Sequence, residues 1–227
     1  MQPTFLPWLG YFGLIKKVDL FVFLDSVQFD SRSWQQRNRI LINGKPHWVT
    51  VPVTCPNGKS TIMKDVLINF EHYSGSKIIS SIRQSYSGTT GIKDLSDSLF
   101  DLLVNPPNHL SLLNIKLIEI ISEKLEIKTE FVNSSELNVK GVKADLLLEI
   151  CKNLGATEYI SPPGSRDYLI DYKGFQSFGI NLNYFEFKHP IYWQKSDEFF
   201  SNLSIIDSIC NQGVKKTQEF ILEGSRS

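Results

Sequence analysis

The 227-residue chain is long enough for one large domain or two small ones around a buried core. Its 24 lysine and arginine residues balance 24 aspartate and glutamate residues, so no overall field attracts nucleic acid or a membrane surface. There is no run of about eighteen apolar residues and no basic-then-apolar signal peptide, and three scattered cysteines favour a reducing compartment. We therefore expect a cytoplasmic protein with no nucleic-acid partner and no membrane span.

The first segment predicts a short helix followed by a buried strand. The chain opens directly on "MQPTFLPWLGYF", and we expect a strand upstream of Met1. Residues 8–17 fit a short helix, whereas residues 20–24 form a continuous apolar, β-prone run. Such runs suit strands of a parallel sheet that is covered on both faces.

An antiparallel hairpin follows. The dipeptide Asn43-Gly44 lies between two β-rich stretches, which is a strong hairpin signal. We expect residues 36–42 to pair with residues 47–53, and residues 64–68 to add a short strand.

Apolar residues recur at helical spacing between about residue 73 and residue 126. The clearest helix is "HLSLLNIKLIEIISEKLEI", for which Asn108 is the expected N-cap. We expect the hairpin and helices of residues 36–105 to form an insertion beside the sheet.

The remaining sequence alternates between strand and helix, and Gly155 ends the helix "KADLLLEICKNLG". Alternation with connections of this length implies right-handed βαβ units and a mainly parallel sheet. We therefore predict a single α/β domain over residues 1–215, with a mainly parallel, Rossmann-like sheet and a hairpin-plus-helix insertion. The charged tail, residues 216–227, is expected to fray.

The first group of candidate site residues lies where the apolar strand ends. In open α/β sheets, ligands bind beyond the carboxyl ends of the strands, and Asp25 occupies this place. Arg37 and Arg39 follow, with the amides of Gln28 and Asn38. Arginine presents a planar fork that suits phosphate or carboxylate. An ion pair that caps the sheet explains the same residues without a ligand.

The second group is the turn "YISPPGSRDYL" after a predicted strand. The strand ends at Ser161, Gly164 lets a ligand approach the backbone, and Ser165 is the expected cap of the next helix, whose free N–H groups favour anions. The turn matches neither common phosphate-binding glycine motif. An ordinary capped strand-to-helix turn is the alternative.

The third group is "KHPIYWQ", in which His189 precedes Tyr192, an aromatic that suits a sugar or nucleobase. His47, beside Trp48 in the hairpin, is expected on a half-buried face. Either histidine could act as an acid or a base, although a packed structural role explains both. None of the four histidines has metal-ligand spacing, so we predict no metal site, and the sequence identifies no cofactor.

The stretch "LPWLGYFGLI" is spaced like the H-x-G-H motif of nucleotidylyltransferases, with Trp8 and Tyr11 in place of the histidines. Aromatic rings can stack on a ligand, but they cannot stabilise phosphoryl transfer as an imidazolium does. This is an analogy of shape and topology.

Several motifs together resemble a WbqC-like protein from the first residue to about Gly213: "MQPTFLPWLGYFGLI", "DSVQF", "SWQQRNRILINGKPHWVTVPV", "LNIKLIEIISEKLEIKTEFVNSSEL", "LLEICKNLGATEYISPPGSRDYL" and "LSIIDSICNQG". Relatives often carry a second acid where Ser26 stands and a lysine near Ser31, so the resemblance does not extend to a mechanism that needs them. The family motifs fall on Gln2, Pro3, Gly10, Tyr11, Asp25, Gln28, Arg37, Asn38, Arg39, His47, Trp48, Ser161, Gly164, Tyr168, His189, Pro190 and Asp207.

The resemblance implies a role in bacterial surface polysaccharide (O-antigen) or specialised-metabolite biosynthesis, by acyl or aminoacyl transfer to an amino sugar. The expected partner is a small-molecule or carrier-linked substrate such as a nucleotide sugar. Arg37 and Arg39 would hold phosphate or carboxylate, Asp25 would orient the amine or an arginine, and His47 or His189 would move the proton. A degenerate nucleotidylyltransferase and a non-catalytic scaffold remain as alternatives. All three depend on whether residues 25, 38, 164 and 189 converge at one rim of the sheet.

Overall fold

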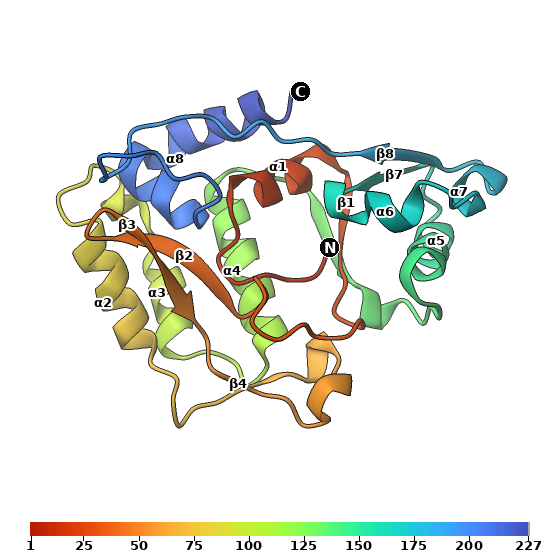
Figure 1. The fold of residues 1–227 in the computed structure, drawn as a ribbon, viewed down its shortest axis with the longest axis horizontal. Coiled ribbons are helices and arrows are strands. Elements are labelled where there is room, and N and C mark those ends of the chain that lie inside the picture. The colour runs from red at the N-terminus through yellow and green to blue at the C-terminus, as the bar shows by residue number, and fades with distance from the viewer. Residues whose placement is uncertain (227) are drawn as a thin grey trace.

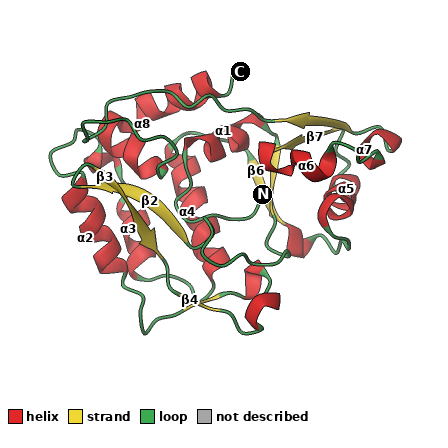
Figure 2. Cartoon of the chain, in the orientation of Figure 1, coloured by secondary structure: helices red, strands yellow, loops and turns green. Residues whose placement is uncertain are grey.

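Short two-stranded sheets make up the β-structure of the computed structural model, which describes residues 1–226. Strand β1 (Leu20–Phe23) pairs in parallel with β6 (Glu130–Asn133), and β7 (Glu158–Ser161) pairs in parallel with β8 (Asn181–Tyr184). The antiparallel pairs are β2 (Arg37–Ile42) with β3 (Lys45–Thr50), and β4 (Val53–Thr54) with β5 (Leu67–Ile68). Figure 2 shows these strands among the helices and loops.

The chain is therefore a mixed α/β protein with parallel strand pairs, but the single, mainly parallel Rossmann-like sheet is not confirmed. The two parallel pairs do not hydrogen-bond to each other in the described residues. A cavity lies between β1 and β7 instead.

The helices surround these strands: α1 (Leu9–Lys17), α2 (Gly75–Ser85), α3 (Asp97–Val104), α4 (Leu110–Lys124), α5 (Lys143–Asn153), α6 (Arg166–Leu169), α7 (Gly174–Ser177) and α8 (Ile205–Gly224). Figure 1 shows the β2–β3 hairpin with α2 and α3 on one side and β7, β8 and α5–α7 on the other. Helices α1 and α4 lie between these two groups.

The hairpin turn forms where the sequence predicts it, but the second strand spans Lys45–Thr50 and not residues 47–53, because the two-residue turn pairs Ile42 directly with Lys45. Asn43 and Gly44 both have positive φ, 51° and 73°, as a tight hairpin turn requires. Buried Ile40 and Val49 belong to the inner face, whereas Arg39 lies opposite Trp48 on the outer face.

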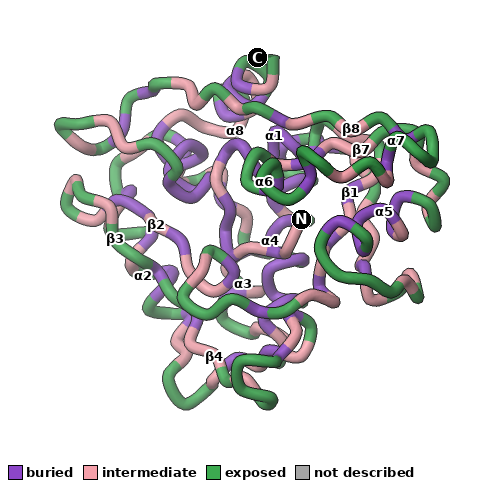
Figure 3. Tube along the Cα trace, turned by 45° about the vertical axis from the view of Figure 1, so that its right-hand side comes forward, coloured by how far each residue is buried: buried purple, intermediate pink, exposed green. Residues whose placement is uncertain are grey.

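The buried residues form two clusters. The main core includes Phe12, Phe23 and Leu117, and the second, smaller core includes Leu147 and Phe175. Figure 3 shows long buried stretches along α4 and α8 and more exposed chain around α6 and α7.

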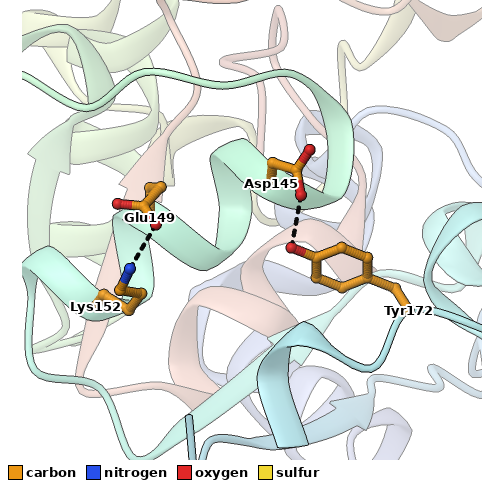
Figure 4. A network of polar contacts seen from close by, with 4 residues as sticks. All are labelled: Asp145, Glu149, Lys152 and Tyr172. Carbon is orange, nitrogen blue, oxygen red and sulfur yellow. Dashed lines mark hydrogen bonds and ion pairs between the residues drawn. The ribbon is translucent and has the colours of Figure 1, made fainter. Parts of the chain in front are cut away.

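The second core lies between α5, α7 and the β7–β8 pair. Figure 4 shows the polar contact at its rim, in which the Tyr172 hydroxyl donates to Asp145 at 2.7 Å. That hydrogen bond, more than burial, raises the pKa of Tyr172 to about 12. Glu149 and Lys152 form an ion pair on the same helix.

Two local expectations are wrong. Helix α4 is capped at His109 and not at Asn108, whose carbonyl accepts from the amide of Ile68 instead. The chain beyond residue 215 does not fray, because α8 continues to Gly224 after a kink at Gly213 and buries Phe220 and Ile221. Ser227, the last residue of the predicted tail, lies outside the described residues.

Candidate functional site

Two arginines and two tryptophans gather on the outer face of the β2–β3 hairpin. The Arg37 guanidinium carbon lies 4.2 Å from the centroid of the Trp48 ring, and that of Arg39 lies 5.5 Å from Trp34 and 5.7 Å from Trp48. The indole centroids are 5.0 Å apart, and both rings are exposed to more than 40%. Arg37 and Arg39 lie two residues apart on one strand, so their side chains share a face. We call these four residues the arginine–tryptophan face.

Neither arginine of this face has an acidic partner. Within residues 1–226 the ion pairs are Lys152–Glu149, Arg166–Glu186 and Lys216–Glu219, none of which includes Arg37 or Arg39. The Nε atoms of both arginines are shielded from water and lack a hydrogen-bond partner among the described residues. A buried donor without a partner costs free energy, so an anion with acceptor oxygens complements this face.

Asp25 lies just beyond the carboxyl ends of β1 and β6, where the strand-end rule places a ligand site. It is 5% exposed. Its Oδ1 accepts from the Ser134 hydroxyl at 3.0 Å and from the Ser135 amide at 2.9 Å, and its Oδ2 accepts from the Ser135 hydroxyl at 2.6 Å. A carboxylate has about four acceptor positions, so Oδ2 retains one for a further donor.

The N-terminal segment lies between Asp25 and the arginine–tryptophan face. Gln2 donates from Nε2 to the carbonyl of Gln28, and the buried Tyr11 hydroxyl donates to the carbonyl of Gln2. Burial raises the pKa of Tyr11. The buried Asn38 amide donates to the carbonyls of Phe5 and Leu6. Gln28 in turn donates from its side chain to the carbonyl of Lys59. The two hydrogen bonds of Asn38 hold the N-terminal segment against the hairpin.

The turn after β7 is closed by its own side chains. Ser161 is buried and contacts the Ser165 hydroxyl, which donates to the carbonyl of Pro162 at 2.7 Å. Ser165 precedes α6 but makes no side-chain capping bond to it. Gly164 has open space where a Cβ would lie. Tyr168 is 43% exposed, and burial of its remaining surface raises the pKa of its hydroxyl.

His189 is half-buried among aromatic rings. Its imidazole stacks on Trp8, with centroids 6.0 Å apart and an angle of 9° between the planes, and on Tyr192 at 6.1 Å. Its Nδ1 lies 2.8 Å from the carbonyl oxygen of Pro190. That oxygen can only accept, so Nδ1 carries the proton and Nε2 is the basic atom of the neutral ring. Burial lowers the pKa of His189, which favours this neutral form.

His47 is exposed, and not half-buried as the strand alternation suggests. It lies opposite Ile40 in the hairpin register, so it belongs to the other face from Arg37 and Arg39.

Asp207 is fully buried in the first turn of α8. Its carboxylate accepts from the hydroxyls of Tyr86 and Tyr192, both at 2.9 Å, and from the amides of Gln194 at 2.9 Å and Asn211 at 3.1 Å. Burial raises the pKa of Asp207 to about 6, although these hydrogen bonds oppose the shift. The buried carboxylate connects α8 to the segments that carry Tyr86 and Tyr192.

Two of the predicted site residues, Arg39 and His189, are connected to each other through Ser204 and Trp8. Ser204 donates its amide to the carbonyl of Arg39 and forms an antiparallel bridge with Trp8, whose ring stacks on His189. In the part of the chain that the structure describes, Asp25 and the turn at Gly164 make no hydrogen bond to Arg39, Ser204, Trp8 or His189. The two cavities described in this structure are lined by other residues.

Sequence reasoning missed three residues of these groups: Trp34, Ser134 and Ser135. Trp34 precedes the "QQRNR" stretch and lies three residues before Arg37, which is not the even spacing that places side chains on one face of a strand. Ser134 and Ser135 follow a predicted strand, so the strand-end rule that selects Asp25 also indicates them.

Within residues 1–226, these features define a mixed α/β protein with two half-buried arginines that form no ion pair, beside two exposed tryptophans, and with a buried carboxylate at the ends of two parallel strands. The chain belongs to the WbqC-like protein family, whose model matches residues 2–219. The chain is 30% identical over 217 residues to the uncharacterized protein Rv1507c of Mycobacterium tuberculosis. This alignment covers 95% of this chain and 93% of that protein. No solved structure matches the chain.

Two searches of the described residues gave negative results. Over residues 1–226, no helix is both long and apolar enough to cross a membrane. In the same range, no three His, Cys, Asp or Glu side chains gather in a way that could hold a metal ion.

Proposed function

We propose that this protein is a cytoplasmic transferase that acts on a nucleotide-linked or carrier-linked sugar in bacterial surface polysaccharide or specialised-metabolite biosynthesis. The observation that carries the proposal is the arginine–tryptophan face. Two guanidinium groups that form no ion pair among residues 1–226 lie beside two exposed indoles. Family membership supports the same proposal.

The two components of this face match the two components of such a substrate. The guanidinium groups of Arg37 and Arg39 suit the oxygens of a phosphate or diphosphate, because each presents several donors in one plane. The exposed rings of Trp34 and Trp48 offer flat apolar surfaces on which a nucleobase or a sugar ring can stack. A nucleotide sugar contains both an anionic and a ring component.

The transfer step that we propose moves an acyl or aminoacyl group to the amine of an amino sugar. The amine nitrogen attacks the carbonyl carbon of the donor, the bond to the carrier breaks, and a base accepts the proton that the amine loses. His189 is suited to this role, because Nε2 of its neutral ring is basic. Asp25 would orient the attacking amine through the free acceptor position of Oδ2. His47 is the alternative proton carrier, and its exposure suits exchange with water.

The remaining predicted residues belong to the proposal as substrate contacts. Gly164 has open space where a Cβ would lie, and Tyr168, four residues later in the chain, is exposed. A substrate that extends from the hairpin toward this turn would use both. Tyr11, Asn38, Ser161 and Asp207 are buried, so their part would be to hold the surrounding segments in place.

The test is a thermal-shift screen of nucleotide sugars, acyl-CoA species and nucleoside triphosphates with Mg²⁺, on the wild type and on the double variant Arg37→Ala/Arg39→Ala. A ligand at 100 times its Kd stabilises the folded state by about 2.7 kcal/mol. We expect a shift with a nucleotide sugar that the double variant lacks. Equal shifts in both proteins, or no shift with any nucleotide sugar, would contradict the proposal.

Turnover separates an enzyme from a binding protein. With the ligands found in the screen, the His189→Gln variant should lose about 10²–10⁴-fold in kcat while its thermal shift persists. Ligand binding without product formation in the wild type would instead favour the non-catalytic scaffold. A response limited to triphosphate and Mg²⁺ would favour the nucleotidylyltransferase alternative.

A further inference from the structure

Asp25 is a nearly buried carboxylate that forms no ion pair within residues 1–226. It lies just beyond β1 and β6, where only 5% of its surface is exposed. A buried carboxylate is normally paired with a cation or hydrogen-bonded, because a charge without partners loses its hydration. Here Ser134 and Ser135 supply neutral donors, so the negative charge is hydrogen-bonded but not neutralised by these contacts.

The directions of the neighbouring hydroxyl protons follow from hydrogen-bond counting, because a hydroxyl has one proton and two lone pairs. Ser134 donates its proton to Oδ1 of Asp25 at 3.0 Å. The Ser26 and Ser134 hydroxyl oxygens are 2.7 Å apart, so Ser26 is the donor in that contact. Ser134 also accepts from the Ser26 amide at 3.2 Å. Ser135 donates its proton to Oδ2 at 2.6 Å, so all three hydroxyl protons are used in the direction of the carboxylate.

The free positions of this group are therefore acceptors. Ser26 and Ser135 each keep two lone pairs on the hydroxyl oxygen, and neither oxygen accepts a hydrogen bond from the described residues. Oδ2 of Asp25 also has one position left. Both serines are half-buried, so a ligand group can reach their oxygens. A negative charge surrounded by acceptors disfavours an anion and favours a cation that donates several hydrogen bonds.

A primary ammonium group fits these acceptors better than a divalent metal ion does. It has three N–H donors and no acceptor, and Oδ2 of Asp25 and Oγ of Ser135, which are 2.6 Å apart, can accept from the same nitrogen. Calcium takes about six to eight oxygen ligands, and magnesium demands near-ideal octahedral geometry. Over residues 1–226, no three His, Cys, Asp or Glu side chains gather to provide such a set.

We propose that Asp25, Ser26 and Ser135 form a binding site for the primary ammonium group of a substrate. Oδ2 of Asp25 and the Ser135 hydroxyl accept two of its N–H donors, and the Ser26 hydroxyl accepts the third. The inference deepens the proposed function, in which Asp25 orients an amine, and rests on it for the source of the ammonium group. That source is either an amino sugar or the α-amino group of an aminoacyl donor.

The test is an NMR titration of the full chain that follows the amide of Ser135, which donates to Asp25 at 2.9 Å. It is done at about pH 6.5, where amines with a pKa of about 8 are charged. The probes are glucosamine and glycinamide, with glucose and acetamide as their uncharged counterparts and potassium chloride as the source of a metal ion. No probe contains phosphate, so failure at this site is distinct from failure of the nucleotide-sugar screen at Arg37 and Arg39.

We expect at least one of the two amines to bind about tenfold or more tightly than its uncharged counterpart, because it adds charged hydrogen bonds. Asp25→Asn removes the charge and should weaken this binding at least about tenfold. Ser26→Ala removes only a half-buried hydroxyl and should also weaken it about tenfold, which keeps the test decisive if Asp25→Asn does not fold. Ser60→Ala, at an exposed position, should change it less than about twofold.

Tighter binding of glucosamine supports the proposal and assigns the ammonium group to the amino sugar. Tighter binding of glycinamide supports it and assigns the group to the aminoacyl donor. Equal affinities for the amines and their uncharged counterparts would overturn the proposal. Equal amine affinities in Ser26→Ala and Ser60→Ala would overturn it too, as would a shift of the Ser135 amide by potassium at a lower concentration than either amine requires.

Discussion

The guanidinium carbon of Arg37 lies 4.2 Å from the centroid of the Trp48 ring, on the outer face of the hairpin. On the inner face, Asn38 and Val49 are buried. The inner face of the hairpin therefore packs against the rest of the protein, whereas Arg37 and Trp48 lie on its outer face. The proposed substrate site is built on this separation of the two faces.

The first prediction concerns the hydrogen bonds that hold Asp25. The variant Ser135→Ala removes the hydroxyl that donates to Oδ2 at 2.6 Å. A hydrogen bond to a charged group contributes about 1.5–3 kcal/mol, so the free energy of unfolding should fall by that amount in urea denaturation. Ser60→Ala, at an exposed position, is the control and should change it by less than about 0.5 kcal/mol. Equal losses in the two variants would show that the Asp25 contact adds nothing.

The second prediction concerns pH and Asp207. Burial raises the pKa of this carboxyl from 3.8 to about 6, so the folded state binds a proton that the unfolded state releases between these values. Its contribution to stability is fully present below about pH 4 and is lost as the pH rises through 6. Compared with Asp207→Asn, the wild type should lose about 2 kcal/mol more between about pH 4.5 and pH 7.5.

The measurement for this second prediction is the free energy of unfolding at several pH values for both proteins. Ser60→Ala, at an exposed position without a titratable group, should keep the wild-type pH profile. A profile for Asp207→Asn that is parallel to that of the wild type would mean that the buried carboxyl does not titrate in this range.

The third prediction concerns the packing of Trp8 on Gly10. A Cβ on Gly10 would lie 2.2 Å from the Trp8 ring, so Gly10→Ala must displace the indole and its stack on His189. The pKa of His189, which burial lowers, should then rise toward about 6.5, as measured by an NMR titration of the imidazole. Gly164→Ala meets no atom within 4 Å and should leave that pKa unchanged. An unshifted pKa in Gly10→Ala would show that Trp8 does not control the environment of His189.

Local patterns predict much of the fold. The Asn43-Gly44 turn, the helix after Pro7 and the end of α5 at Gly155 occur as expected, because each depends on backbone geometry within a few residues. The apolar run predicted as a strand at residues 20–24 forms β1 over Leu20–Phe23 for the same reason: its composition favours extended backbone.

The sequence does not predict features that depend on contacts between distant segments. The sequence predicts β1 and β7 in one sheet, but they belong to separate parallel pairs, and the residue pattern of neither strand encodes which neighbour it pairs with. The sequence beyond Lys215 is largely polar, which does not predict a buried segment. In the structure, the second part of α8 follows a kink at Gly213, and its side chains Phe220 and Ile221 are buried. The carboxylate of Asp207 is buried because donors from the end of α2, from residues 192–194 and from α8 itself surround it. Such placements arise from tertiary packing, which overrides local preference.

The most direct test of the proposed substrate site is the affinity of a nucleotide sugar, measured by isothermal titration calorimetry with UDP-N-acetylglucosamine and UDP-glucose as probes. Arg37→Ala removes a guanidinium group without an acidic partner, whereas Lys45→Ala removes an exposed charge at the turn of the same hairpin. We predict that Arg37→Ala weakens binding at least about tenfold, as the loss of a charged hydrogen bond requires, and that Lys45→Ala changes it less than about twofold. Equal affinities for the two variants, or no binding of either sugar by the wild type, would contradict the arginine–tryptophan face as the substrate site.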